Sequence, residues 1–190
     1  MASQNKIIII TAPSGAGKTS ITHHLLKTFP QLAFSVSATT RKARENEKHS
    51  LDYYFISEEE FQQKIQNNEF VEWEMVYEGK YYGTLKSELQ RIWTLNRIPL
   101  LDIDVKGAIH VQQQLPDSSI SIFIVPPTVD VLKKRLLSRG TESEASLAAR
   151  VNKAAYELSF KDEFHKQILN DDLEKAREEA GRIVQEFIDV

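Results

Sequence analysis

One segment near the N-terminus has the residue types and the spacing of a phosphate-binding loop. It reads Ala12-Pro13-Ser14-Gly15-Ala16-Gly17-Lys18-Thr19 and matches the pattern GxxxxGK[ST] except at its first position, where alanine replaces glycine. Small residues let backbone N–H groups curl around a phosphate chain, and a helix N-terminus adds partial positive charge. Lys18 adds a full positive charge, and Thr19 offers a hydroxyl to Mg²⁺. The segment therefore predicts a site for the phosphates of a nucleotide.

The elements on either side of this loop have to hold it in shape. Residues 6–11 form a continuous run rich in isoleucine, which predicts a buried strand of a parallel sheet. Apolar residues recur at intervals of four from Ile21 to Phe29, which predicts a helix from about Lys18. A strand, a glycine-rich turn and a helix are the context that the motif requires; a turn that only packs tightly is the alternative. The alanine at position 12 matters little if its φ is negative.

Strands and helices are predicted to alternate along the rest of the chain. Continuous apolar runs predict strands at 99–105, 119–125 and 167–169. Helices are predicted after the capping box of Ser57 and Glu60, at 128–138, and from Asp171 or Asp172 onward. This alternation predicts an α/β fold with a mostly parallel sheet.

Composition limits the class of protein. The 190 residues are 41% hydrophobic, enough for one core, and 24 basic against 27 acidic side chains give a net charge of −3. Without a strongly basic stretch, we expect no nucleic-acid partner. The sequence has no cysteine, which excludes disulfides and thiol chemistry and is compatible with a reducing cytoplasm, where we expect the chain. The apolar run at 7–10 is too short to cross a membrane, and we expect no membrane partner.

Residues between Ser35 and Thr84 carry information that a phosphate loop alone does not. They include the runs Ser37-Ala38-Thr39-Thr40-Arg41-Lys42-Ala43-Arg44, Glu47, Asp52-Tyr53, Phe55, Glu69-Phe70-Val71-Glu72-Trp73 and Tyr81-Tyr82-Gly83-Thr84. Together with 101–104, 134–136 and 139–142, these runs resemble guanylate kinases, and the resemblance extends in order from Ile7 to about Asp172.

The resemblance implies a fold and a division of the chain. The fold is the three-layer α/β type of P-loop NTPases, with an inserted mixed GMP-binding region and a short lid. A single domain covers residues 1–190. Its core is expected at about 1–34, 97–137 and 152–190, its GMP-binding region at about 35–96, and its lid at about 138–151.

The resemblance also implies an acceptor site. Arg41 and Arg44 match guanidinium groups that hold the GMP phosphate, a task that suits planar, permanently charged groups. Glu72 matches a carboxylate that reads guanine. This carboxylate would accept hydrogen bonds from the N1–H and N2–H₂ groups of guanine, whereas adenine presents an acceptor at N1. Taken singly, Glu72 fits simple alternation in an exposed strand equally well. The implied GMP-contacting residues are Ser37, Arg41, Arg44, Tyr53, Glu72, Tyr82, Gly83, Thr84, Asp102 and Asp104.

On the donor side, the resemblance implies residues that bind ATP and neutralise charge. Asp102 and Asp104 would lie between the nucleotides, or else form a solvated strand end. Asn170 matches an adenine-side residue, although Asn-Asp-Asp is also a common helix N-terminus. The implied catalytic residues are Lys18, Arg41, Asp102, Arg135, Arg139 and Arg150; the three last match lid arginines or form a solvated helix face. The implied nucleotide-binding residues are Ala12, Pro13, Ser14, Gly15, Ala16, Gly17, Lys18, Thr19, Ser20 and Asn170, with Thr19 toward Mg²⁺.

The implied reaction is direct transfer of the γ-phosphoryl group of ATP to GMP, and to dGMP, with Mg²⁺ and without a covalent intermediate. Two other functions stay open. A guanylate-kinase-like binding module would lack the lysine of the phosphate loop and the lid arginines. A kinase for another phosphorylated acceptor would lack the guanine-reading set of Ser37, Glu72 and Thr84. The sequence departs from the usual family pattern at Ala43, Asn46, Ser50 and Lys106.

Overall fold

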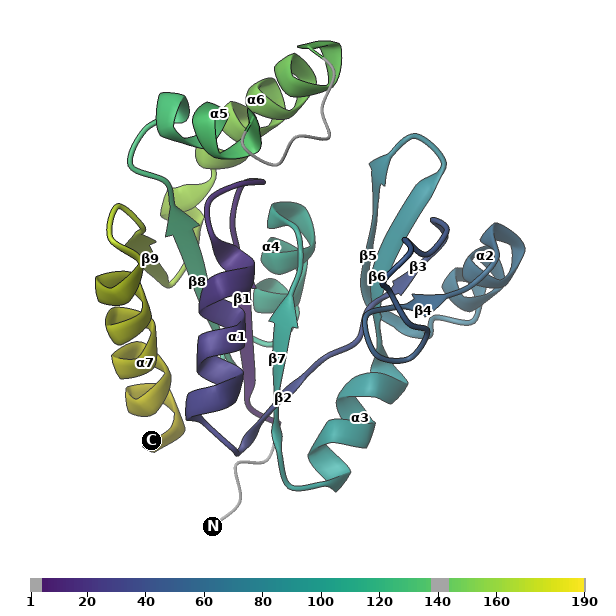
Figure 1. Ribbon diagram of the computed structural model, residues 1–190. Helices are drawn as coiled ribbons and strands as arrows, with labels where there is room; N and C mark the ends of the chain where they lie inside the picture. Colours follow the sequence, from purple (N-terminus) through teal and green to yellow (C-terminus); the bar gives the residue numbers. More distant parts are fainter. Residues whose placement is uncertain (1–4, 138–143, 190) are drawn as a thin grey trace.

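The computed structural model describes residues 5–137 and 144–189 and contains two separate sheets (Figure 1). The larger sheet has the strand order β2-β7-β1-β8-β9, and every neighbouring pair in it is parallel. Its strands are β1 (Ile7–Thr11), β2 (Leu32–Phe34), β7 (Ile98–Asp102), β8 (Ser119–Val125) and β9 (Lys166–Leu169). The carboxyl ends of these strands therefore meet at one edge, where ligands of open α/β sheets bind.

The central strand β1 is buried on both faces, as its uninterrupted isoleucines predict. Ile8 and Ile10 pack in the cluster that includes helices α1 (Lys18–Thr28) and α7 (Leu173–Asp189). The alternate side chains of β1 pack against α3 (Lys86–Thr94) and α4 (Val105–Gln114). Helices thus cover both faces of the sheet, which confirms the predicted three-layer α/β fold.

The second sheet is mixed and lies to one side of the first (Figure 1). Its order is β4-β3-β6-β5, with β3 parallel to β4 and the other two pairs antiparallel. Its strands are β3 (Ala38–Thr39), β4 (Tyr54–Phe55), β5 (Phe70–Tyr77) and β6 (Lys80–Leu85). Helix α2 (Glu58–Gln66) packs on it through Phe61, and the Ser57 hydroxyl caps that helix as predicted, accepting from the Glu60 N–H at 3.1 Å.

Two further helices lie beyond the carboxyl end of β8 (Figure 1). Helix α5 (Val129–Leu137) and helix α6 (Glu144–Leu158) share a small apolar cluster, and a short 3₁₀ helix (Lys161–Glu163) follows. Helix α6 is not among the predicted elements: the described part of the predicted lid is the start of a long helix rather than a polar loop. The predicted end of the preceding helix at Ser138 and Gly140 lies outside the described residues.

Two predicted boundaries need correction, and side-chain caps explain both. Strand β7 ends at Asp102 instead of Val105, because the Asp104 carboxylate accepts from the N–H groups of Lys106 and Gly107 and starts helix α4. Helix α7 starts after Asp172, whose carboxylate accepts two backbone N–H groups of the first turn. None of the helices within 5–137 and 144–189 has the length and apolar character needed to cross a membrane.

Candidate nucleotide site

A cleft of about 320 Å³ lies between the phosphate loop, the second sheet and helix α6. Most of the residues predicted for the site line it. These are Ala12, Pro13, Ser14, Gly15, Gly17, Lys18, Thr19, Ser20, Ser37, Tyr53, Glu72, Tyr82, Gly83, Asp102, Asp104 and Arg150. One cavity thus joins the predicted donor side to the predicted acceptor side.

The phosphate loop has the backbone geometry that its glycines permit. Gly15 and Gly17 have φ values of 89° and 100°, and the Ala16 N–H closes a turn onto the Pro13 carbonyl at 3.1 Å. Ala12 is not among the described residues with positive φ, so an alanine side chain there is not strained. Helix α1 begins at Lys18, directly after the loop, so its N-terminus faces the cleft.

Lys18 is held by the carboxyl edge of the large sheet. Its Nζ lies 2.5 Å from the Asp102 carboxylate and donates to the Ile103 carbonyl at 3.1 Å. Burial disfavours the charged form of Lys18, but the Asp102 carboxylate outweighs burial, so the pKa of Lys18 is raised above its ordinary value. Asp102 is therefore the ion-pair partner of the loop lysine and not a solvated strand end.

Asn170 contacts the phosphate loop from behind. Its side chain is 3% exposed, and its Nδ2 donates to the Ala16 carbonyl at 2.7 Å. A Cβ atom at Gly17 would collide with this amide, so the glycine also makes room for Asn170. Asn170 does not line the cleft, and its amide supports the loop from behind, so the implied contact with adenine stays a prediction. The N-terminus of helix α7 is capped by Asp172.

The three predicted lid arginines have different positions. Arg135, on α5, donates to the Asn170 carbonyl at 3.1 Å and so links α5 to the segment behind the phosphate loop. Arg150, on α6, lines the cleft. Arg139 lies outside the described residues.

On the acceptor side, Arg41 is held by several neighbours, among them Glu47, Tyr82 and Tyr53. Its guanidinium group makes a bidentate pair with Glu47 at 2.5 and 2.7 Å, and its Nε donates to the Tyr82 hydroxyl at 3.2 Å. The guanidinium also lies 4.8 Å from the centre of the Tyr53 ring. The hydrogen bonds from Arg41 lower the pKa of Glu47 to about 2, so Glu47 is negatively charged at neutral pH.

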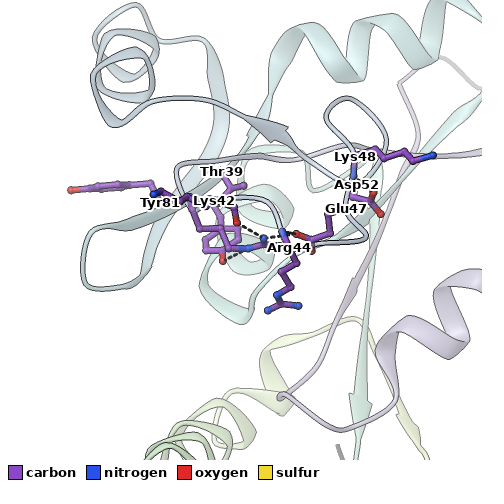
Figure 2. A network of polar contacts seen from close by, with 9 residues as sticks. Thr39, Lys42, Arg44, Glu47, Lys48, Asp52 and Tyr81 are labelled. Atoms are coloured by element: carbon purple, nitrogen blue, oxygen red, sulfur yellow. Dashed lines mark hydrogen bonds and ion pairs between the residues drawn. The ribbon is translucent and has the colours of Figure 1, made fainter. Parts of the chain in front are cut away.

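Glu47 also shapes the loop that carries Arg44 (Figure 2). Its carboxylate accepts from the Arg44 N–H at 2.9 Å, while the Arg44 side chain extends away from it. Farther along, Asp52 accepts from the Lys48 N–H at 2.8 Å. Between them Ser50 has a φ of 67°, a value that favours glycine, so this departure from the family pattern puts a side chain on strained backbone.

Glu72 is the most deeply buried acid of the cleft. It is 5% exposed, and its Oε1 accepts from the Thr84 hydroxyl at 2.6 Å. Burial raises the pKa of Glu72 to about 8 from an ordinary value of 4.5, although the Thr84 hydrogen bond opposes the change. Ser37 lines the same cleft. Glu72 is therefore a buried group aimed into a cavity, not an exposed residue of an alternating strand.

Some residues of the cleft were not predicted from the sequence. Lys153 and Glu157 of α6 line it next to Arg150, and burial raises the pKa of Glu157. The signal was present, because apolar residues recur with helical spacing from Leu147 to Leu158 and place these charged side chains on another side of one helix. The role of Glu47 as the partner of Arg41 had no local sequence signal.

Within the described residues, no group of three or more histidine, aspartate or glutamate side chains is arranged to hold a metal ion. The donor side does offer the Thr19 hydroxyl at the start of α1 and the carboxylate of Asp102 nearby. Mg²⁺ usually keeps several waters and binds proteins through one or two oxygens plus substrate phosphates. The residues present therefore fit a magnesium ion that arrives with a nucleotide.

Comparisons with known proteins agree with this geometry. The family model described as guanylate kinase matches residues 4–187. A guanylate kinase of Bacteroides fragilis is 44% identical over 185 residues, which cover 97% of this chain and 91% of that protein. One of Thermotoga maritima is 41% identical and covers 96% of this chain and 87% of its own length. The crystal structure of guanylate kinase from Anaplasma phagocytophilum matches with a TM-score of 0.78 at 30% identity, over 97% of this chain and 87% of that one.

Proposed function

The chain belongs to the guanylate kinase family and is an ATP:GMP phosphotransferase, and we propose that the transfer takes place in the cleft described above. In this proposal the phosphate loop, residues 12–20, binds the phosphates of ATP through its backbone N–H groups and Lys18. The left-handed glycines of the loop and the helix that starts at Lys18 support the assignment.

The acceptor phosphate binds beside Arg41, Tyr53 and Tyr82. These three side chains are already in contact with one another, which supports a common ligand. A phosphate group would compete with Glu47 for the guanidinium of Arg41, and Arg44, on the same loop, adds a second positive charge. Preorganised charges of this kind lower the barrier because little reorganisation remains at the moment of transfer.

The base of GMP is read by Glu72, and the burial of this carboxyl beside Thr84 carries the proposal. A carboxylate that accepts the N1–H and N2–H₂ groups of guanine regains the hydrogen bonds that burial removed. Adenine would set its N1 acceptor against the carboxylate, which leaves buried polar groups unpaired and is strongly disfavoured.

Transfer then needs positioning and charge neutralisation more than covalent chemistry. A phosphate oxygen of GMP bonds to the γ-phosphorus while the bond from that phosphorus to the bridging oxygen of ATP breaks, giving GDP and ADP. Lys18 and Arg150 lie along the cleft where they would neutralise charge on the transferred group, and Asp102 holds Lys18 in place. Bound Mg²⁺ would supply charge neutralisation at the phosphates, held by Thr19.

Of the two alternatives, neither is favoured by the residues present. A silent binding module would not need the ion pair of Lys18 and Asp102, and a kinase for another acceptor would not need Glu72, Thr84 and Ser37 together. A cytoplasmic location and the use of dGMP stay predictions, the former because the sequence lacks cysteine.

A coupled assay tests the proposal. ADP release would be measured with Mg·ATP and each of GMP, dGMP, AMP, CMP and UMP, for the wild-type chain and for Glu72→Gln. We expect turnover with GMP and dGMP only, and a kcat/KM for GMP at least tenfold lower in Glu72→Gln with an unchanged KM for ATP. Equal turnover of AMP and GMP by the wild type, or unchanged GMP kinetics in Glu72→Gln, would rule out base reading by Glu72.

A further inference from the structure

Gly107, in the first turn of helix α4, lies directly against the Glu72 carboxylate. A Cβ atom built on Gly107 would lie 2.5 Å from Oε2 of Glu72 and 3.1 Å from its Cδ. The other oxygen, Oε1, accepts the hydrogen bond from Thr84 at 2.6 Å. The carboxylate is thus confined from two sides, by a hydroxyl on one and by the bare backbone of a glycine on the other.

The backbone at this position does not itself demand glycine. Gly107 is absent from the described glycines with positive φ, and its N–H donates to the Asp104 cap as in an ordinary helix start. Glycine is a poorer helix former than alanine, so its presence inside a helix needs a reason such as the close approach of another group. The carboxylate of Glu72 is that group.

We propose that the missing side chain at Gly107 sets the position of the Glu72 carboxylate, which makes Gly107 a positioning residue for base selection. The inference rests on the proposed reading of guanine by Glu72. A methyl group at position 107 would have to push Oε2 away by roughly 1 Å to reach ordinary contact, and misplacing a positioning group by that much costs on the order of 10²-fold. The end of a flexible side chain moves more easily than the helix, so the carboxylate would yield.

The test is Gly107→Ala, with Gly181→Ala as a matched control. Gly181 is also helical, in α7, and a Cβ there would meet its nearest atom, in Phe29, at 3.9 Å, which is ordinary contact. We expect Gly107→Ala to raise the KM for GMP by roughly 10- to 100-fold and to lower the preference for GMP over IMP, which lacks the N2 amino group. The KM for ATP should stay within twofold, and Gly181→Ala should leave all these values unchanged.

A double-mutant cycle with Glu72→Ala isolates the contact. Once the carboxylate is removed, the methyl group at position 107 has room, so Gly107→Ala should change GMP kinetics less than twofold in the Glu72→Ala background. If Gly107→Ala instead lowers the melting temperature, Glu72→Ala must restore it, because the same clash would be responsible.

The outcomes separate this inference from the proposed function. If Glu72→Ala impairs GMP use but Gly107→Ala behaves like Gly181→Ala, only the role of Gly107 is wrong. An effect of Gly107→Ala that persists undiminished in the Glu72→Ala background also overturns it, as does a lost stability that Glu72→Ala does not restore. If Glu72→Ala leaves GMP use unchanged, base reading by Glu72 and the role of Gly107 are both wrong.

Discussion

The donor side of the cleft is built mainly on one stretch of chain, residues 12–20, whereas the acceptor side combines side chains from several strands, a loop and a helix. On the donor side, the groups proposed to bind phosphate are backbone N–H groups and a helix N-terminus, and Lys18 has a charged partner in Asp102. On the acceptor side, the buried carboxyl of Glu72 is hydrogen-bonded by the uncharged Thr84, and burial raises the pKa of Glu72 to about 8. The lysine of the donor side has an opposite charge beside it before a nucleotide binds, and Glu72, the proposed base-reading group, does not have one among its hydrogen-bond partners in the described residues.

Because of this difference, the two sides of the cleft should respond differently to substitutions and to pH. A site made of backbone groups tolerates a substitution such as alanine at position 12, provided that φ stays negative. A site made of buried side chains depends on their protonation and on the exact space around them. Perturbations of the donor side should therefore act on catalysis or ATP, and perturbations of the acceptor side on GMP.

The largest effect is expected for Lys18→Met. Loss of the ammonium group would remove the charge proposed to neutralise the transferred phosphoryl group, and kcat should fall by about 10²–10³-fold. The KM for GMP should change little, because Lys18 acts on the donor side. Steady-state kinetics would check this, with Lys27→Met as control, since Lys27 is an exposed lysine on the same helix. A kcat within fivefold of wild type would mean that Lys18 does not neutralise the transferred group.

The next largest effect is expected for pH, which should change the affinity for GMP but not the affinity for ATP. Glu72 with a pKa of about 8 is mostly protonated below that pH, yet it must be a carboxylate to accept the guanine donors. Apparent GMP affinity should therefore fall by about tenfold per pH unit below about 8 and be constant above it. ATP affinity should not follow, since the pKa of Lys18 is raised and the lysine stays charged. Calorimetry between pH 6 and 9 would check both, and a flat GMP profile would contradict the prediction.

The raised pKa of Glu72 also makes the stability of the folded chain depend on pH. The folded-state pKa of Glu72 lies above its ordinary value of 4.5, so the contribution of Glu72 to stability is fully present below pH 4.5 and is lost as the pH rises through about 8. Glu72→Gln removes the ionisation but keeps an acceptor for Thr84. Its melting temperature relative to wild type should therefore be higher at pH 9 than at pH 6, in the same variant that loses GMP use.

A smaller effect is expected for Asn170→Asp, which tests the support behind the donor side. The aspartate has the same shape but cannot donate to the Ala16 carbonyl. Loss of this buried hydrogen bond should cost about 1–2 kcal/mol. The KM for ATP should rise by roughly tenfold, with the KM for GMP within twofold. Asn96→Asp is the control, because Asn96 is exposed in a turn away from the cleft. A change in the KM for GMP with an unchanged KM for ATP would mean that Asn170 does not support the donor side.

The smallest effect is expected for Ser50→Gly. Glycine relieves the strain of a φ of 67° but adds freedom to the unfolded chain, so the net gain should be about 0.5–1 kcal/mol. For a chain of this size that corresponds to a rise in melting temperature of about 1–4 °C. GMP kinetics should be nearly unchanged because Ser50 is exposed outside the cleft lining. A lower melting temperature would indicate that the serine is not strained.

Elements with local signals could be predicted from the amino-acid sequence. The isoleucine run of β1, the glycine spacing of the loop and the helical repeat of α1 are each contained in consecutive residues, so the phosphate loop and the α/β class were predictable. The candidate acceptor residues could be named from the family resemblance, because that resemblance depends on residue types and their order in the sequence. Helix α6 was not predicted, although its apolar residues recur with helical spacing, because charged residues between the apolar ones obscured the repeat.

Contacts between residues far apart in the chain depend on how the elements pack. Asn170 supports Ala16, and Glu72 lies against Gly107, because the fold brings separate segments together. The pairing of Arg41 with Glu47 lies within one loop and depends on how that loop folds. Burial decides the pKa of Glu72 and the partnership of Lys18 with Asp102, and burial is a property of the packed molecule. Local spacing specifies which backbone forms, but desolvation and close contact arise only when separate elements pack.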